Sequence, residues 1–217
     1  MKKFAFVSDF DGTLSSKDFY HIIIDKYMGL KGREFYLEWK KTKKINVEFL
    51  NKIFGSVNLS EKEIFDEIIN IPIDAHAKEF INRVQESDGD FYIVSAGTSY
   101  YIKILLEHMG IKNVQVISME GVYTNGGIKI MPDTSSQYYS DVFGLDKRKV
   151  IESINKDYEY IFFAGDSEPD LGAAKAADMV YARGELVELL GKENVGFMAF
   201  SDFKQIENDL ILKGWLK

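Results

Sequence analysis

The sequence predicts an α/β protein: a Rossmann-like, mostly parallel sheet with helices on both faces, plus a small all-helical cap inserted after the first strand. Two observations lead to this expectation. Short apolar stretches alternate with helical patterns over most of the chain, which is typical of parallel sheets. Between residues 16 and 86, directly after the first strand, only helical patterns occur. We therefore expect a core of residues 1–15 and 87–217 and a cap of residues 16–86.

The first strand is predicted at residues 3–8, where an apolar run precedes a turn. The first helix of the insertion is expected to begin at Ser16 or Lys17 and to end at Met28. Asn46 is a suitable N-cap for a later helix, and the sequence SEKE from Ser60 has the capping-box pattern. Further helices of the insertion are predicted at residues 32–44, 46–54, 60–69 and 74–85.

Strands and helices alternate in the remaining chain. Because ligands bind at the carboxyl edge of open α/β sheets, Asp9, Ser95 and Asp166, each at a predicted strand end, are expected to meet in one cleft. A hairpin is predicted at the Asn125-Gly126 turn. Strands are predicted at residues 91–95, 114–118, 160–166 and 179–182, and helices at residues 100–109, 147–155, 171–177, 185–190 and 203–212.

The composition is that of an ordinary globular protein of 217 residues with a formal net charge of −7. This charge argues against nucleic-acid binding as a general mode. No apolar run reaches the roughly 18 residues of a membrane helix, and the apolar run before Asp9 is too short for a secretory signal. The chain has no cysteine. We expect a cytoplasmic protein without membrane or nucleic-acid partners; the sequence carries no signal for oligomeric state.

Two carboxylates, Asp9 and Asp11, stand two residues apart at the first strand end. A turn is the ordinary explanation of such a sequence, but GDSEPD at residues 165–170 adds Asp166 and Asp170 after another strand. Neighbouring carboxylates repel and raise each other's pKa, and Mg²⁺, which prefers oxygen ligands, removes that cost. With Asp9 and Asp166 as ligands, such an ion retains positions for phosphate and water.

Groups suited to bind phosphate accompany these carboxylates. The hydroxyl of Ser95, the backbone N–H groups of the helix start that follows it, and the cation Lys147 all match phosphate oxygens. An aspartate can form a covalent aspartyl-phosphate, and a second carboxyl group can transfer protons. The residues therefore predict a phosphoryl-transfer site. Hydrolysis, transfer to another acceptor by a phosphotransferase or mutase, and metal or phosphate binding without catalysis remain alternatives.

The motifs DFDGT, SAG, Lys147 and GDSEPD, in this order within residues 4–183, resemble those of the haloacid dehalogenase (HAD) superfamily in its phosphatase branch. The resemblance implies that Asp9 is the nucleophile and a metal ligand. It implies that Asp11 is the general acid/base, and the presence of this residue argues against a dehalogenase. It also implies that Asp11 binds Mg²⁺ through its backbone carbonyl. Asp166 is implied to be a metal ligand, and Asp170 an acidic residue that supports the metal site.

The resemblance also assigns phosphate and substrate contacts. Phosphate is implied to bind at Ser95, Ala96, Gly97 and Lys147, although Lys149 and, less favourably, Arg148 compete for the role of the lysine. Asp18, nine residues after Asp9, stands where this branch has an acidic substrate-binding residue.

The helical insertion resembles a type 1 cap, and the overall pattern is similar to phosphoserine phosphatases and to 2-hydroxy-3-keto-5-methylthiopentenyl-1-phosphate phosphatases. SAG and GDSEPD depart from the usual phosphoserine phosphatase motifs, and the latter enzymes' cysteine-rich stretch is absent. The resemblance implies a Mg²⁺-dependent phosphatase that hydrolyses a small phosphorylated metabolite through an aspartyl-phosphate.

Other conspicuous residues are interpreted as structural. The run KKTKK at residues 40–44 is expected to be the solvated end of a helix. Phe35, Tyr36 and Trp39 are expected to pack inside the cap, with a place in the substrate pocket as the alternative.

Overall fold

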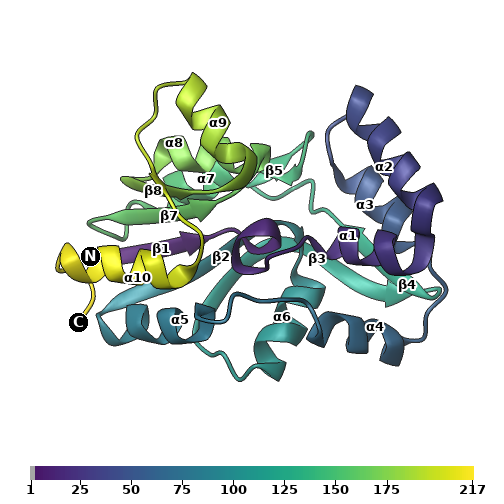
Figure 1. The fold of residues 1–217 in the computed structure, drawn as a ribbon, viewed down its shortest axis with the longest axis horizontal. Helices are drawn as coiled ribbons and strands as arrows, with labels where there is room; N and C mark the ends of the chain where they lie inside the picture. The colour runs from purple at the N-terminus through teal and green to yellow at the C-terminus, as the bar shows by residue number, and fades with distance from the viewer. Residues whose placement is uncertain (1–2) are drawn as a thin grey trace.

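A seven-stranded sheet forms the centre of the computed structural model, which describes residues 3–217 (Figure 1). The central strand β1 (Phe4–Ser8) pairs in parallel with β2 (Gly89–Thr98) on one side and β7 (Ile161–Gly165) on the other. The strand order is β4-β3-β2-β1-β7-β8-β9, and β4 alone among these strands runs antiparallel to its neighbour. The outer strands are β3 (Val114–Thr124), β4 (Gly127–Met131), β8 (Met179–Ala182) and β9 (Met198–Ala199).

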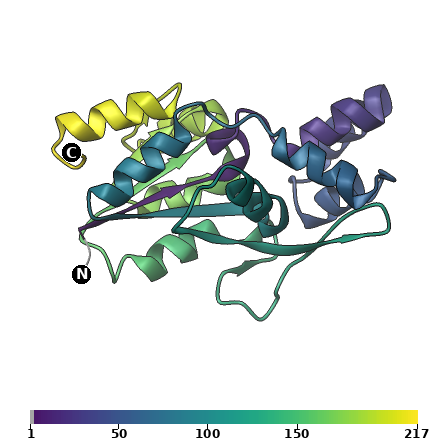
Figure 2. The same cartoon turned by 90° about the horizontal axis from the view of Figure 1, so that it is seen from below.

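Helices cover both faces of this sheet, as Figure 2 shows. Because successive strand side chains point to opposite faces, β1 sends Phe4 and Phe6 into one hydrophobic cluster and Ala5 and Val7 into the other. The predicted α/β fold with a mostly parallel sheet is thereby confirmed. The phenylalanine side carries α5 (Ala77–Glu86), α6 (Ser99–His108) and α10 (Phe203–Leu212), and the opposite side carries α7 (Lys147–Ile154), α8 (Leu171–Ala176) and α9 (Gly184–Lys192).

The insertion after β1 forms a helical cap beyond one end of the sheet (Figure 1). Its first helix is shorter than predicted, because Asp18 precedes it as the N-cap residue and a π-helical turn, Ile24–Met28, ends it before Gly29, whose φ is +56°. Phe49 packs against Phe35 and Trp39 inside the cap. The cap helices are α1 (Phe19–Ile23), α2 (Gly29–Thr42), α3 (Val47–Phe54) and α4 (Glu61–Ile69).

The two segments that join cap and core run side by side. Ser15 and Ile73 form an antiparallel β-bridge, and the N–H groups of Ser16 and Asp74 donate to the carbonyls of Pro72 and Leu14, respectively, at 2.8 and 2.9 Å. The cap is also fastened to the β3–β4 hairpin. Asn51 on α3 exchanges hydrogen bonds of 2.7 and 3.1 Å with the backbone of Ile130 on β4.

Helix α5 belongs to the sheet rather than to the cap. Its Phe80 ring lies 4.7 Å from that of Phe6 on β1 and 5.3 Å from that of Phe203 on α10. We therefore propose that the cap ends near Ile73, before the boundary predicted at residue 86.

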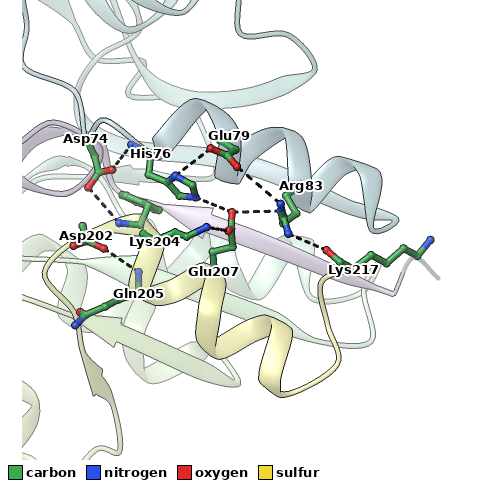
Figure 3. A network of polar contacts seen from close by, with 10 residues as sticks. Asp74, His76, Glu79, Arg83, Asp202, Lys204, Gln205, Glu207 and Lys217 are labelled. Atoms are coloured by element: carbon green, nitrogen blue, oxygen red, sulfur yellow. Dashed lines mark hydrogen bonds and ion pairs between the residues drawn. The ribbon is translucent and has the colours of Figure 1, made fainter.

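A polar network ties α5 to α10 around the fully buried Glu207 (Figure 3). His76 Nε2 lies 2.8 Å from one oxygen of Glu207, and Lys204 Nζ lies 2.5 Å from the other. Arg83 Nε approaches Glu207 to 3.5 Å and its guanidinium also donates to the carbonyl of Lys217. Glu207 is thus compensated by basic side chains, and the network fixes the last helix on the core.

Several strands differ from the predicted ones. Residues 114–118 and the first arm of the hairpin form one continuous strand, β3, and β2 extends to Thr98, past the predicted end at Ser95. Strands β5 (Tyr139–Ser140), β6 (Gly144–Leu145) and β9 are only two residues long, too short to leave an alternating pattern. Among residues 3–217, no helix combines the length and apolar character needed to cross a bilayer.

Candidate active site

The chain turns sharply where it leaves β1, and this turn brings it against a second loop. Gly12 has a φ of +80°, and a Cβ at this position would lie 2.4 Å from Oδ2 of Asp166. Thr13 donates its hydroxyl to Oδ1 of the same carboxylate at 2.9 Å. Glycine is therefore required for both the backbone conformation and the close approach, and the turn joins the first and last motifs predicted from sequence.

Asp9, at the C-terminal end of β1, is buried with an exposed fraction of 4%. Its Oδ1 accepts a hydrogen bond from Phe10 N–H at 2.6 Å and lies 2.6 Å from Nζ of Lys147. Within the described chain, Oδ2 of Asp9 has no hydrogen bond. Burial and the Asp170 carboxylate raise the pKa of Asp9 well above its usual range, although Lys147 opposes them.

Lys147 is the cation at this site. Its Nζ lies 2.6 Å from both Asp9 and Asp170, and these two carboxylates outweigh the effect of burial and raise the lysine pKa above its usual range. Lys149 instead donates to the carbonyl of Tyr139, and Arg148 pairs with Glu152. Of the three basic residues considered from sequence, Lys147 is thus the one placed beside Asp9.

Three carboxylates could hold a metal ion here. Asp9, Asp166 and Asp170 each offer one oxygen, and these oxygens all lie within 4.8 Å of one another. Asp170 is fully buried; one oxygen meets Lys147 and the other accepts from the N–H groups of Asp166 and Ser167. Burial and the charge of Asp170 raise the pKa of Asp166 to about 7. A divalent cation would relieve this repulsion, and an all-oxygen donor set suits Mg²⁺.

Asp11 is held by different partners. Its Oδ1 accepts from Phe19 N–H at 2.9 Å, at the start of the cap, and its Oδ2 accepts from the hydroxyl of Tyr101 at 2.5 Å. Burial, followed by the charge of Asp18, raises the pKa of Asp11 to about 7, while the hydrogen bonds from Tyr101 and Phe19 limit the rise. A carboxyl group with this pKa exchanges a proton readily near neutral pH.

The end of β2 supplies the predicted phosphate-binding segment. Ser95, Ala96 and Gly97 line the same cavity as Asp9 and Asp11. Ser95 accepts a hydrogen bond from Gly97 N–H at 3.0 Å, and the strand register shifts between Ser95 and Thr98. A Cβ at Gly97 would lie 1.8 Å from the hydroxyl of Tyr101. Only glycine therefore lets this segment pass beside the Tyr101–Asp11 hydrogen bond.

A cavity of about 550 Å³ lies between the cap and these groups, and Asp18 is part of its wall. Burial together with the charge and hydrogen bonding of Asp18 raises the pKa of Tyr20, another wall residue. Tyr36 also lines the cavity, so one of the cap aromatics lies in the pocket, as the alternative interpretation held. The run at residues 40–44 lines the cavity as well, although the sequence suggested only a solvated helix end.

Sequence reasoning missed Tyr101 and Arg183. Arg183 Nε donates to the carbonyl of Gly12, and its Nη2 donates to those of Thr13 and Ser15, at 2.7, 2.7 and 3.1 Å. Arg183 directly follows β8, so its position after a predicted strand was an available signal. Tyr101 lies within an ordinary helical pattern that carries no such signal.

A family model for haloacid dehalogenase-like hydrolases matches residues 6–175. The matched region includes the candidate catalytic and metal-binding residues Asp9, Asp11, Lys147, Asp166 and Asp170, but not Arg183. The chain belongs to this family. It is 27% identical over 208 residues to a 2-hydroxy-3-keto-5-methylthiopentenyl-1-phosphate phosphatase of Bacillus cereus (strain G9842), and the match covers 93% of each chain.

Solved structures of phosphoserine phosphatases share the fold of this HAD-like hydrolase. A substrate-bound complex aligns with a TM-score of 0.72 at 16% identity, covering 96% of this chain and 98% of the other. A structure described as a phospho-aspartyl intermediate analogue of phosphoserine phosphatase aligns with a TM-score of 0.69 at 18% identity, covering 96% and 99% of the two chains. The predicted family and its phosphatase branch are confirmed.

Proposed function

We propose that the protein is a Mg²⁺-dependent phosphatase that hydrolyses a small phosphorylated metabolite through an aspartyl-phosphate on Asp9. The observation that carries this proposal is the different placement of two aspartates two residues apart. Asp9 is bound by Lys147 and Phe10 N–H through one oxygen only, whereas both oxygens of Asp11 accept hydrogen bonds. This asymmetry supports a nucleophile at Asp9 and a proton-transfer group at Asp11.

The nucleophile must be ionised when it attacks phosphorus. Burial and Asp170 oppose ionisation of Asp9, whereas Lys147, which keeps its positive charge between Asp9 and Asp170, favours the carboxylate form, and a bound Mg²⁺ would favour it further. In the proposed first step, Oδ2 of Asp9 forms a bond to phosphorus and the bond to the leaving oxygen breaks. In the second step, water attacks the same phosphorus and restores the Asp9 carboxylate.

Asp11 is proposed to move the protons in both steps. Its pKa of about 7, raised mainly by burial, lets it hold a proton for the leaving oxygen and then accept one from the attacking water. Tyr101 and Phe19 N–H fix the orientation of the carboxyl group, so that only its proton state need change.

The metal is proposed to bind through Asp9 and Asp166, with the backbone carbonyl of Asp11 as a further ligand. Asp170 is proposed to act behind them, because its two oxygens already bind Lys147 and the backbone of Asp166 and Ser167. When bound, Mg²⁺ would supply positive charge to the phosphate oxygens. Ser95, the backbone of Ala96 and Gly97, and Lys147 are proposed to bind the remaining phosphate oxygens.

The substrate class is inferred from the cavity and the relatives. A cavity of about 550 Å³ is in the range of small-molecule sites. The curated relative named above is a phosphatase of a small phosphorylated compound, and the phospho-aspartyl analogue belongs to a protein of the same fold. Both support hydrolysis of a phosphorylated metabolite. Asp18, which lines the cavity, is proposed to contact the leaving group.

The test is phosphate release from a panel of phosphate monoesters in the presence of Mg²⁺. We expect Asp9→Asn to abolish turnover, and mass spectrometry of acid-quenched wild type to find phosphate on Asp9. Asp157→Asn, an exposed aspartate outside the cavity, is the matched control. Retained turnover by Asp9→Asn would refute the mechanism. Phosphate transfer to an added alcohol without net release would indicate a phosphotransferase or mutase. Inactivity on every ester would indicate a module that binds metal or phosphate without catalysis.

A further inference from the structure

The cap presents a concentrated positive charge to the active-site cavity. Lys40, Lys41, Lys43 and Lys44, at the end of α2 and in the loop after it, line the same cavity as Asp9 and Lys147. The protein as a whole carries a formal charge of −7, so this wall has the opposite sign to the molecule. Lysines at a helix C-terminus interact favourably with the helix dipole, but that interaction does not require them to border the cavity.

One of these lysines is unpaired in the described chain. Lys41 pairs with Glu38, and Lys43 lies 3.6 Å from Glu48. Lys44 pairs across the cavity with Glu168, a residue of the loop that follows β7. Among residues 3–217, no carboxylate lies within ion-pair distance of Lys40, whose Nζ stands 5.9 Å from the ring centre of Tyr36. Lys40 is therefore the cation available to a ligand.

Apolar and aromatic side chains also line this cavity. They are Ile45, Leu50 and Phe143, together with Tyr20 and Tyr36. A phosphate group fills only a small part of a cavity of about 550 Å³. The remaining volume can thus hold an elongated leaving group, which contacts apolar as well as charged side chains.

We propose that the leaving group of the substrate carries a second anionic group, a carboxylate or a phosphate, that binds Lys40 at the cap end of the cavity. This inference rests on the proposed phosphatase function and specifies its substrate class. Hydrogen bonds to charged groups contribute more free energy than neutral ones. Because Lys40 is exposed, solvent reduces this contribution. We expect a preference of roughly tenfold in KM over an uncharged leaving group of the same length.

The test compares three phosphate monoesters of one chain length: ω-hydroxyalkyl, ω-carboxyalkyl and ω-phosphoalkyl. Chain length is varied in parallel, because the distance between the phosphate-binding groups and Lys40 determines which ester can reach both. In wild type, we expect the KM ratio of hydroxyl to anionic ester to be about ten at the best length. Lys40→Ala should bring this ratio close to one, and Lys40→Glu should reverse it. Lys31→Ala, an exposed lysine of the same helix outside the cavity, should leave the ratio at its wild-type value.

Whether carboxylate or phosphate is preferred identifies which anion the site takes. A ratio near one in wild type at every chain length overturns the inference but not the proposed function, which only requires that the esters be hydrolysed. Calorimetric binding of the matching non-hydrolysable phosphonates tests the same subsite without turnover. Equal Kd values for hydroxyl and anionic phosphonates overturn the inference even if no ester is hydrolysed, and a Lys40-dependent difference supports it. Raised salt should weaken that difference, since exposed charges are screened.

Discussion

Arg183 offers a sharp test of how the turn after Asp9 is held. Its planar guanidinium donates to the carbonyls of Gly12, Thr13 and Ser15 and also reaches the carbonyl of Ser201 at 3.3 Å. Phe200 lies against it, with the guanidinium carbon 5.3 Å from the ring centre. Because the carbonyls belong to the turn directly after Asp9, Arg183→Ala removes a brace without touching a predicted catalytic carboxylate.

The magnitude follows from the bonds that are lost. Each hydrogen bond of a charged donor contributes about 1.5–3 kcal/mol, and Arg183 makes three of 3.1 Å or less to this turn. Water can replace part of them at this half-buried site, so we expect a loss of about 3 kcal/mol rather than the full sum. For a chain of this size, this corresponds to a fall in Tm of roughly 6–12 °C. Displacement of the turn by about 1 Å should lower kcat roughly 100-fold.

The assay combines thermal unfolding with steady-state phosphate release. Arg183→Lys keeps the charge but not the planar fork of donors, so it should recover part of the Tm and little of kcat. Arg148→Ala is the control, since Arg148 is exposed and pairs only with Glu152 among the described residues; we expect its stability to change by about 0.5 kcal/mol or less. If Arg183→Ala changed neither Tm nor kcat more than this control, the reasoning would be refuted.

Three other predictions use different parts of the molecule. Mg²⁺ should raise the Tm of wild type but not of Asp166→Asn; equal shifts would place the ion elsewhere. Gly12→Ala should destabilise the fold by about 1–3 kcal/mol in urea unfolding because of its left-handed φ and the contact with Asp166, whereas Gly191→Ala, which has open space in α9, should stabilise it by up to about 1 kcal/mol. Burial alone would raise the pKa of Glu207, but its basic neighbours lower it below the usual value. The stabilisation from Glu207 should therefore be present above about pH 4.3, the unfolded pKa, and disappear as pH falls through the lower folded pKa; a wild-type advantage over Glu207→Gln that did not change with pH would contradict this.

The fold and the carboxylate motifs were predictable because their information is local. Asp9 and Asp166 stand at the ends of apolar strands, and parallel strands bring such ends to one edge. Strand assignment therefore predicts that both lie at this edge, and the pairing of β1 with β7 makes them neighbours there. The short helix at residues 19–23 and the two-residue strands were not predictable, because they lack enough residues to establish a period.

The two residues that the sequence did not predict, Tyr101 and Arg183, make contacts between distant parts of the chain. Tyr101 meets Asp11 across 90 residues of sequence, and Arg183 meets Gly12 across 171. No spacing rule connects such pairs, so only the packing of α6 and the end of β8 against the turn reveals them. The lysine run at residues 40–44 was correctly located at a helix end, but its orientation depends on how the cap docks.

The two central aspartates depend on different parts of the molecule. Asp9 is held by groups of the core, Lys147 and its own turn. Asp11 is held on one side by Tyr101 of the core and on the other by Phe19 N–H, where the cap begins, and the charge of Asp18 also raises its pKa. Contacts at the start of the cap thus contribute to the orientation and proton affinity of Asp11, beside Tyr101 and burial, whereas Asp9 makes its hydrogen bond and ion pair within the core. The proposed proton-transfer group therefore has one partner on the core and one at the start of the cap, whereas the proposed nucleophile has its partners on the core alone.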